Sequence, residues 1–260
     1  MKTIRARFFI LLITALVCCS LVFNKLNKNY LFTLLTLPTQ EELNSPANIE
    51  DSLPVSLKAS VFKSRASSVR VVCANLIAGT YSLSSGVYAE YEGNYYVITA
   101  DHGIMDGPTI LFASVDSVQY DAMRIVYSSK ENDYAIFQIE QIPYRVPISI
   151  EKDIPSAKTW KKRLQILDKV IYTGYPNGTG PLTISGEIMG FSGGRIFVRS
   201  YGWSGASGSG VFSKEGDLIG IVSALELGSY EDSMLPIEDS VIITPTYLVD
   251  WAEAFGETYE

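Results

Sequence analysis

The only histidine in this 260-residue chain, His102, follows the apolar run Tyr95–Ala100 in the segment YYVITADHG. Imidazole titrates near neutral pH, so a histidine on the loop after a strand can accept a proton and return it. A histidine that activates a serine needs a carboxylate behind the ring to fix its tautomer and stabilise the imidazolium. Asp133, which directly precedes the apolar run YAIFQI, is the candidate for that carboxylate.

The candidate nucleophile is Ser207, in the glycine-rich segment GWSGASGSGVF. When a serine attacks a carbonyl carbon, two N–H groups must point at the oxyanion that develops. Gly205 permits a backbone shape that a side chain would obstruct, and we expect the N–H groups of Gly205 and Ser207 to form this oxyanion hole. Without a catalytic role, Asp133 would be an ordinary turn aspartate and the segment around Ser207 a flexible Gly/Ser loop.

These segments resemble the motifs of the trypsin/chymotrypsin-like serine proteases. The family's T-A-x-H motif corresponds to Thr99–His102, its D-[aliphatic]-A motif to Asp133–Phe137, and its G-x-S-G-G-P motif to Gly205–Val211. The resemblance covers residues 66–255 and keeps the order His, Asp, Ser. It implies a serine endopeptidase that cleaves protein or peptide substrates through an acyl-enzyme intermediate, without a metal or an organic cofactor.

Departures from the family pattern bear on the site. Asp101, beside His102, could compete as the orienting carboxylate. Ser209 and Gly210 stand where the family has Gly and Pro. Ala206 stands where zymogen-activated members carry an aspartate that pairs with a freshly cut N-terminus. We therefore expect the oxyanion hole to form without such a cut, as in the bacterial and viral members that the chain resembles.

The resemblance also implies where the substrate binds. The corresponding positions are Tyr201, Ser223, Ala224 and Leu225. No acidic residue occupies the pocket-base position, so a preference for Lys or Arg is not predicted. Tyr201 and Leu225 favour medium-sized or apolar side chains, while Glu226 is expected at the surface because glutamates are rarely buried.

The elements that must position these residues read as strands. From residue 66 onward, short β-branched and aromatic runs recur between turn residues, with hairpin signals at Gly93-Asn94 and at Glu215–Asp217. Without alternating helices, this pattern predicts an all-β fold. The resemblance implies two antiparallel six-stranded β-barrels, at about 61–145 and 156–245, with the site in the cleft between them. A short C-terminal helix is predicted within Thr244–Phe255.

The N-terminus has a different character. Basic residues precede an apolar run over residues 8–23, which favours a hydrophobic helix that acts as a signal anchor or a cleaved signal peptide within residues 1–30. Cys18 and Cys19 leave a lipoprotein signal open. Residues 31–60 are predicted to be a linker, and residues 61–260 the protease domain. The predicted location is therefore membrane-anchored, with a single span at 8–23, or secreted.

Composition excludes some functions. The net charge of −7 gives no basic surface for nucleic acid, and the run Lys158, Lys161, Lys162 and Arg163 is interpreted as solvated. Cys73 is the only cysteine beyond the apolar run, so no disulfide can form within the folded domain, and its apolar neighbours predict burial. Asn177–Thr179 would be a glycosylation sequon only in a secretory lumen, and otherwise a simple turn.

Two other functions remain open from the sequence. The first is a catalytically inactive, membrane-anchored peptide-binding module, a pseudoprotease, since a fold does not by itself carry an activity. The second is a membrane-anchored structural or capsid-associated protein that retains a protease-like domain for assembly. The presence of all three candidate triad residues favours the active enzyme over both.

Overall fold

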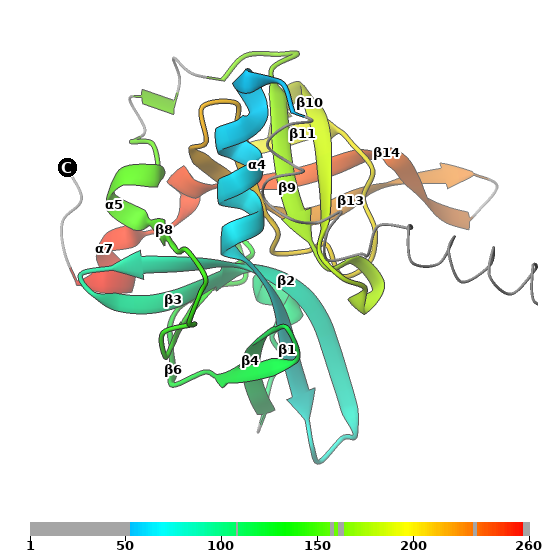
Figure 1. Ribbon diagram of the computed structural model, residues 1–260. Helices are drawn as coiled ribbons and strands as arrows, with labels where there is room; N and C mark the ends of the chain where they lie inside the picture. The colour runs from blue at the N-terminus through cyan, green and yellow to red at the C-terminus, as the bar shows by residue number, and fades with distance from the viewer. Residues whose placement is uncertain (1–52, 108, 157–158, 161–163, 231–232, 257–260) are drawn as a thin grey trace, which may run out of the picture. The chain divides into compact units, whose positions relative to one another are not determined.

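The computed structural model describes residues 53–107, 109–156, 159–160, 164–230 and 233–256, and these residues are mostly β-sheet (Figure 1). The chain from Pro54 onward forms one unit in its contacts. The hydrophobic helix predicted at 8–23 lies outside the described residues, as does most of the predicted linker. Within the described ranges, no helix has both the length and the apolar character needed to cross a membrane.

The first half of the domain is an eight-stranded sheet. Seven strands follow the order β5-β4-β1-β2-β3-β7-β6, and β8 pairs in parallel with β2. Strand β2 is the long central strand from which the sheet extends in both directions. The strands are β1 (Ser68–Asn75), β2 (Thr80–Tyr91), β3 (Asn94–Thr99), β4 (Thr109–Val115), β5 (Val118–Asp121), β6 (Arg124–Ser129), β7 (Tyr134–Ile139) and β8 (Ile148–Ser149).

This sheet is a half-barrel, which corrects the closed six-stranded barrel expected for residues 61–145. Its two edges, β5 and β6, are consecutive in the chain and are joined only by Ala122 and Met123. The N–H of Ala122 donates to Leu111 in β4 at 2.9 Å, and that of Met123 to Gln138 in β7 at 2.8 Å. Each edge strand thus pairs with its own neighbour, and no ladder joins the two.

The second half is a closed antiparallel barrel, which confirms the six strands predicted for residues 156–245. The order around it is β10-β11-β14-β13-β12-β9. The strands are β9 (Lys169–Gly174), β10 (Leu182–Ser192), β11 (Arg195–Arg199), β12 (Gly210–Ser213), β13 (Leu218–Tyr230) and β14 (Ser233–Pro245).

Both predicted hairpins form. The β2–β3 turn consists of Glu92 and Gly93, with φ of 49° and 77°, and so begins one residue earlier than predicted. Two consecutive positive φ values are the mark of the type I′ turn that suits the twist of a hairpin. The second hairpin joins β12 to β13 through Glu215–Asp217, where the N–H of Ser213 donates to Asp217 at 2.9 Å.

Helix α4 (Val55–Ser67) was not predicted, and it begins ahead of the domain boundary placed at residue 61. It lies along the second half of the domain (Figure 1). The hydroxyl of Ser60 donates to the carbonyl of Ser213 at 2.6 Å, and that of Ser64 to Thr173 Oγ1 at 2.7 Å. Its polar residues are therefore used in buried hydrogen bonds, which is why its sequence lacks an apolar helical stripe.

The remaining helices are short. Helix α5 (Ile150–Asp153) follows β8, and α7 (Trp251–Phe255) confirms the short C-terminal helix. Helix α7 is shorter than the predicted range because Thr244 still pairs with Ile221 in the β14–β13 ladder. Single 3₁₀ turns lie at η1 (Asp101–Gly103), η2 (Pro176–Gly178) and η3 (Thr246–Leu248).

Three apolar clusters form the core. One lies within the first half and includes the fully buried Cys73, as predicted, and a second fills the closed barrel. The third contains residues of both halves, among them Ile98 from β3 and Phe212 from β12. Burial of this shared cluster fixes the position of β3 relative to β12, and so of the loops that follow β3 and precede β12.

Polar contacts cross the same boundary. The hydroxyl of Tyr134, a fully buried residue at the start of β7, donates to the carbonyl of Thr244 in β14 at 2.7 Å. Tyr134 directly follows Asp133 in the chain, so this bond ties the candidate carboxylate's segment to the second half.

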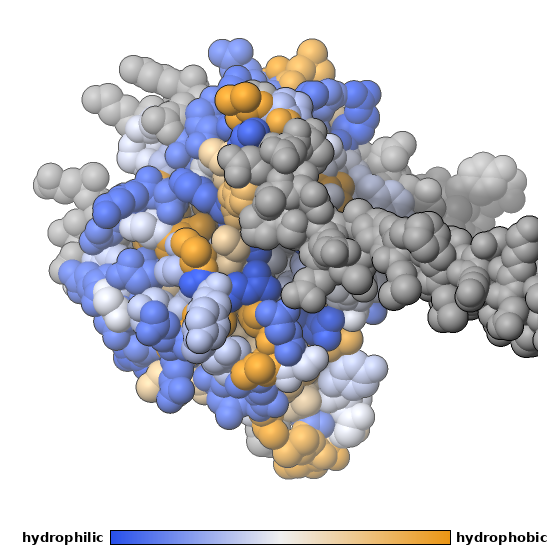
Figure 2. Space-filling model, viewed as in Figure 1, coloured by the Kyte–Doolittle hydropathy of each residue, from blue (hydrophilic) through white to orange (hydrophobic). Residues whose placement is uncertain are grey.

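The surface seen in Figure 2 is mostly hydrophilic over the first half, with scattered hydrophobic spots and a group of hydrophobic residues at the tip of the β1–β2 hairpin. There Leu76 and Ile77 are 69% and 84% exposed. The turn is held by Asn75, whose Oδ1 accepts from the N–H groups of Ile77 at 3.1 Å and Ala78 at 2.9 Å. Local hydrogen bonds rather than burial therefore order this tip.

The bond between the halves can be tested by Tyr134→Phe. The substitution keeps the ring but leaves the buried Thr244 carbonyl without its donor, so we expect the free energy of unfolding to fall by about 1–3 kcal/mol. Tyr247→Phe is the matched control, because its hydroxyl reaches Gly194 at 3.4 Å from a side chain that is 42% exposed. Urea denaturation that gave equal stabilities for the two variants would contradict the role of Tyr134.

Candidate active site

His102 and Asp133 are paired in the structure. Nδ1 of His102 lies 3.0 and 2.9 Å from the two carboxylate oxygens of Asp133, and the backbone N–H of His102 donates to Oδ1 at 2.9 Å. An ionised carboxylate only accepts hydrogen bonds, so Nδ1 carries the proton and Nε2 is the ring's free acceptor. This is the tautomer that a general base for a hydroxyl requires.

The pair shifts both pKa values. The hydrogen bond to Asp133 raises the pKa of His102 above its ordinary 6.5, against the opposing effect of partial burial. Partial burial raises the pKa of Asp133, but the hydrogen bonds from His102 and Ser223 outweigh it and hold that pKa below its ordinary value. The raised pKa of His102 means that its charged form stabilises the fold below about pH 6.5, and that this contribution is lost as the pH rises through the folded-state pKa.

The turn that carries Asp133 is held from the second half of the domain. Asp133 has a φ of 55°, a left-handed conformation that is uncommon for residues other than glycine. Arg195, at the start of β11, donates to the carbonyl of Asn132 at 3.1 Å and to that of Glu131 at 2.9 Å. The Asn132 amide donates to the carbonyl of Leu248 at 3.1 Å. These bonds hold the backbone in the conformation that aims the carboxylate at His102.

Two further side chains define the carboxylate's surroundings. The Ser223 hydroxyl donates to Oδ2 of Asp133. The competing carboxylate, Asp101, is buried and instead accepts a hydrogen bond from the Ser128 hydroxyl at 2.5 Å. Asp133 is therefore the carboxylate that orients the His102 ring.

Ser207 lies in a pair of consecutive β-turns. The carbonyl of Trp203 accepts from the N–H of Ala206, and that of Ala206 from the N–H of Ser209, each at 3.0 Å. The third residues of the two turns are Gly205 and Gly208, with φ of 91° and 84°. A positive φ at this position alone is the pattern of type II turns, which select glycine there.

The N–H groups predicted to form the oxyanion hole are those of Gly205–Ser209 that have no acceptor among the described residues. Within the described residues, the N–H groups of Ala206, Gly208 and Ser209 donate to backbone carbonyls, whereas those of Gly205 and Ser207 have no protein acceptor. The N–H of Gly205 belongs to the Ser204–Gly205 peptide, whose carbonyl accepts from Asn177 at 2.8 Å. Because a peptide is planar, fixing the carbonyl also fixes the direction of the N–H.

The turn packs against the end of β3. A Cβ on Gly208 would come within 2.1 Å of the Ser85 carbonyl oxygen and 3.0 Å of the Ala100 backbone nitrogen. Gly208 and Ala100 are thus in close contact. Ser207 is next to Gly208 in the chain, and His102 is two residues after Ala100. Among the described residues, no hydrogen bond joins the Ser207 hydroxyl to the His102 ring; such bonds tighten when a substrate binds.

The predicted substrate-binding residues fall in different places. Tyr201 stacks on Trp203 with ring centroids 5.6 Å apart, and both line a pocket of about 240 Å³ beside Pro176 and Asn177. Asn177 also bonds to Ser204, so this pocket adjoins the Ser207 turn. Ala224 is exposed on β13, Ser223 bonds to Asp133, and the side chain of Leu225 lies outside the described part.

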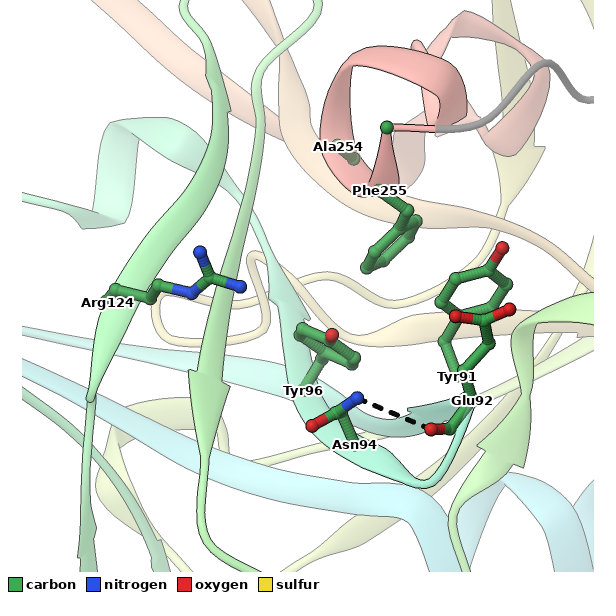
Figure 3. A pocket seen from close by; sticks show the side chains of 8 residues that line it. Tyr91, Glu92, Asn94, Tyr96, Arg124, Ala254 and Phe255 are labelled. Carbon is green, nitrogen blue, oxygen red and sulfur yellow. Dashed lines mark hydrogen bonds between the residues drawn. The ribbon is translucent and has the colours of Figure 1, made fainter.

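A second pocket, of about 380 Å³, lies at the C-terminal helix. Figure 3 shows the rings of Tyr91, Tyr96 and Phe255 gathered on one side of it, and Arg124 on the other. None of the predicted site residues lines it. It is a separate feature of the surface, between the β2–β3 hairpin, β6 and α7.

With this geometry established, comparison with known proteins identifies the family. A family model, the trypsin-like peptidase domain, matches residues 84–221, which is more than half of the chain and includes His102, Asp133 and Ser207. The chain belongs to the trypsin-like peptidase family. No curated protein matches it.

Solved structures share the fold of this trypsin-like peptidase. A serine endoprotease from Yersinia pestis is 24% identical, with a TM-score of 0.57 over 76% of this chain and 65% of its own. The HtrA-type protease AlgW, solved with a tripeptide, is 20% identical, with a TM-score of 0.58 over 75% of this chain and 61% of its own. The chain therefore spans less than two thirds of these two proteins. The Rv3671c protease from M. tuberculosis, in its active form, is 16% identical, with a TM-score of 0.59 over 83% and 88%.

Several residues of the peptidase site were missed from the sequence. Ser85 and Arg195 carry no motif, and only the folded chain brings them to the turns of Ser207 and Asp133. Trp203 stands in the Ser207 segment itself, but no motif marked it as a pocket residue. Ser223 was expected at the substrate edge, and its contact with Asp133 was not predicted. Its family-like position in the sequence was a signal from which that contact could have been predicted.

Proton NMR can test the pairing, because the chain has a single histidine. We expect the pKa of His102 to lie above 6.5 in the wild type and to be lower in Asp133→Asn, since a neutral amide cannot stabilise the imidazolium. Asp106→Asn is the control, because Asp106 is 90% exposed and pairs with Lys130 at 3.2 Å. An unchanged His102 pKa in tag-free Asp133→Asn protein would rule out the pairing.

The packing of the Ser207 turn can be tested by Gly208→Ala. An alanine would be strained at the positive φ of this position, and its Cβ would meet the Ser85 carbonyl oxygen. We therefore expect a loss of about 2–5 kcal/mol in the free energy of unfolding. Gly79→Ala is the matched control, since Gly79 has a φ of 65° but no atom within 4 Å of the place that a Cβ would occupy. Similar stabilities of the two variants would show that the turn is not packed as described.

Proposed function

We propose that this protein is a serine endopeptidase that hydrolyses peptide bonds through a triad of Ser207, His102 and Asp133. The observation that supports it most is the double contact of His102 Nδ1 with the Asp133 carboxylate, which leaves Nε2 as the acceptor. The packing of Gly208 against Ala100 adds to it, because it brings the serine's turn to the histidine's loop.

The proposed mechanism follows from these contacts. Ser207 Oγ attacks the scissile carbonyl carbon while its proton passes to Nε2 of His102, and Asp133 stabilises the resulting imidazolium. The oxyanion accepts hydrogen bonds from the N–H groups of Gly205 and Ser207. His102 then gives its proton to the leaving amine as the C–N bond breaks. Water, deprotonated by His102, hydrolyses the acyl-enzyme and restores Ser207.

The substrate is proposed to bind as an extended strand. Strand β12 pairs with β13 no further than Ile221, whereas β14 pairs with β13 beyond it. In the described ladders, the segment Ser223–Leu225 therefore has one edge without a strand partner, and a peptide can add there. The pocket beside Tyr201 and Trp203 favours an apolar substrate side chain.

Ser207→Ala provides the direct test of catalysis. We expect kcat for a peptide substrate to fall by a factor on the order of 10⁶, because the nucleophile is lost. Circular dichroism should show an unchanged fold, since only the backbone carbonyl of Ser207, and not its hydroxyl, is bonded in the structure.

A fluorophosphonate probe separates this enzyme from a pseudoprotease. The probe should label the wild-type protein and not Ser207→Ala, whereas Ser209→Ala should still be labelled, because Ser209 is buried. A folded wild-type sample that the probe does not label would favour the inactive peptide-binding module instead.

We also propose that residues 8–23 direct the chain to a membrane, as a retained anchor or as a cleaved signal. The support is the basic flank followed by an apolar run. Mass spectrometry of the mature protein distinguishes the two, because a cleaved signal leaves a mature chain that lacks these residues. A mature cytosolic protein that retained them would count against both.

A further inference from the structure

Ser85 joins the two halves of the domain at the Ser207 turn through its backbone N–H and its hydroxyl, and its carbonyl is bonded within the first half. It lies in β2, and it is completely buried. Its backbone N–H donates to the carbonyl of Ser207 at 2.8 Å, and its hydroxyl donates to the carbonyl of Gly205 at 2.7 Å. Its hydroxyl oxygen accepts from the N–H of Tyr175 at 2.9 Å, and its carbonyl accepts from Thr99 Oγ1 at 2.7 Å.

These contacts fix alternate peptides of the turn. The carbonyls of Gly205 and Ser207 belong to the peptides that directly follow the two free N–H groups. The peptides that contain those N–H groups are held through the carbonyls of Ser204, by Asn177, and of Ala206, by Ser209. The Gly205–Ala206 peptide, whose carbonyl the Ser85 hydroxyl holds, lies between the two peptides that carry the free N–H groups and shares a Cα atom with each. The hydroxyl of Ser85 therefore restrains the backbone from which both free N–H groups extend.

The same hydroxyl holds the segment that supports the turn from the other side. Tyr175 and Asn177 flank Pro176, and a Cβ on Gly205 would come within 2.9 Å of the Tyr175 carbonyl and 3.1 Å of the Asn177 nitrogen. Arg70, from β1, lies over the Tyr175 ring at 5.3 Å and donates to the carbonyls of Gly178 and Thr179, each at 2.8 Å. The first half of the domain thus supports both the turn and the loop behind it.

We propose that Ser85 is a positioning residue for the oxyanion hole, a role that rests on the proposed function of the Ser207 turn. Ala206 has no carboxylate, so the turn cannot be ordered by an ion pair at that position. The buried hydroxyl of Ser85 supplies the order instead. It never touches the substrate; it acts through the peptides of Gly205 and Ser207.

The experiment measures the rate at which a fluorophosphonate probe labels the full-length protein as a function of pH. The acid limb of that profile reports the pKa of His102, and the plateau above it includes the stabilisation of the phosphonyl oxygen by the oxyanion hole. We expect Ser85→Ala to lower the plateau by about tenfold to a hundredfold, less than the roughly 10²–10³-fold effect of losing an oxyanion donor itself. The acid limb should stay at the wild-type pH, because Ser85 does not contact His102 or Asp133.

Ser60→Ala is the matched control. Ser60 is also completely buried, and its hydroxyl also donates to a backbone carbonyl, that of Ser213 at 2.6 Å, but it lies in α4. This variant should lose stability and keep the wild-type plateau. If Ser85→Ala does not fold, Ser85→Cys takes its place, because a thiol of similar size is a weak donor and should lower the plateau in the same way.

The outcomes separate the two proposals. A wild-type plateau in the Ser85 variant, or an equal loss in Ser60→Ala, would overturn the role of Ser85. A shift of the acid limb would also overturn it, because the substitution would then act through His102. Labelling of Ser207→Ala at the wild-type rate would overturn the proposed function itself, whatever the Ser85 variant shows.

Discussion

The hydrogen bonds between β2 and the Ser204–Ser209 segment are the constraint on which the candidate site depends. A glycine-rich turn has many accessible backbone conformations, and glycine loses more freedom than any other residue when it is fixed. Here the peptides of the turn are held by Ser85, Asn177 and Val222 from elsewhere in the domain, except the Ala206–Ser207 peptide, which is held by Ser209 within the turn. Among Gly205–Ser209 in the described structure, these bonds occupy the N–H groups of Ala206, Gly208 and Ser209 and leave those of Gly205 and Ser207 free.

The histidine side of the site is also ordered by hydrogen bonds from elsewhere in the domain. Asp133 is held in a left-handed conformation, which costs energy unless the surroundings enforce it. Arg195 supplies much of that enforcement through the carbonyls of Glu131 and Asn132. Both halves of the site are thus ordered by residues from the opposite half of the domain, so the docking of the halves and the assembly of the site are one event.

The sequence predicted the contact of His102 with Asp133 better than the scaffold that supports it. His102 and Asp133 could be paired from their motifs, because each directly follows or precedes an apolar strand. The closed second barrel and the β2–β3 hairpin followed from strand patterns and turn residues. The prediction that the first sheet closes into a barrel was wrong. No pattern in the sequence shows that β5 and β6 are the two edges of the sheet, joined by only Ala122 and Met123. Helix α4 was missed because its buried face carries serines rather than an apolar stripe. Ser85 was missed because its partners lie up to 122 residues away, at Ser207.

The reach of Ser85 has a consequence for how the molecule is made. Its partners span Thr99 to Ser207, so during synthesis Ser85 lacks its partners in the Ser207 turn until most of the domain has left the ribosome. Contacts of such long sequence separation form late, after the loop-closure entropy has been overcome. A chain that ended before Gly205 would therefore leave the hydroxyl and the N–H of Ser85 without their partners in the turn.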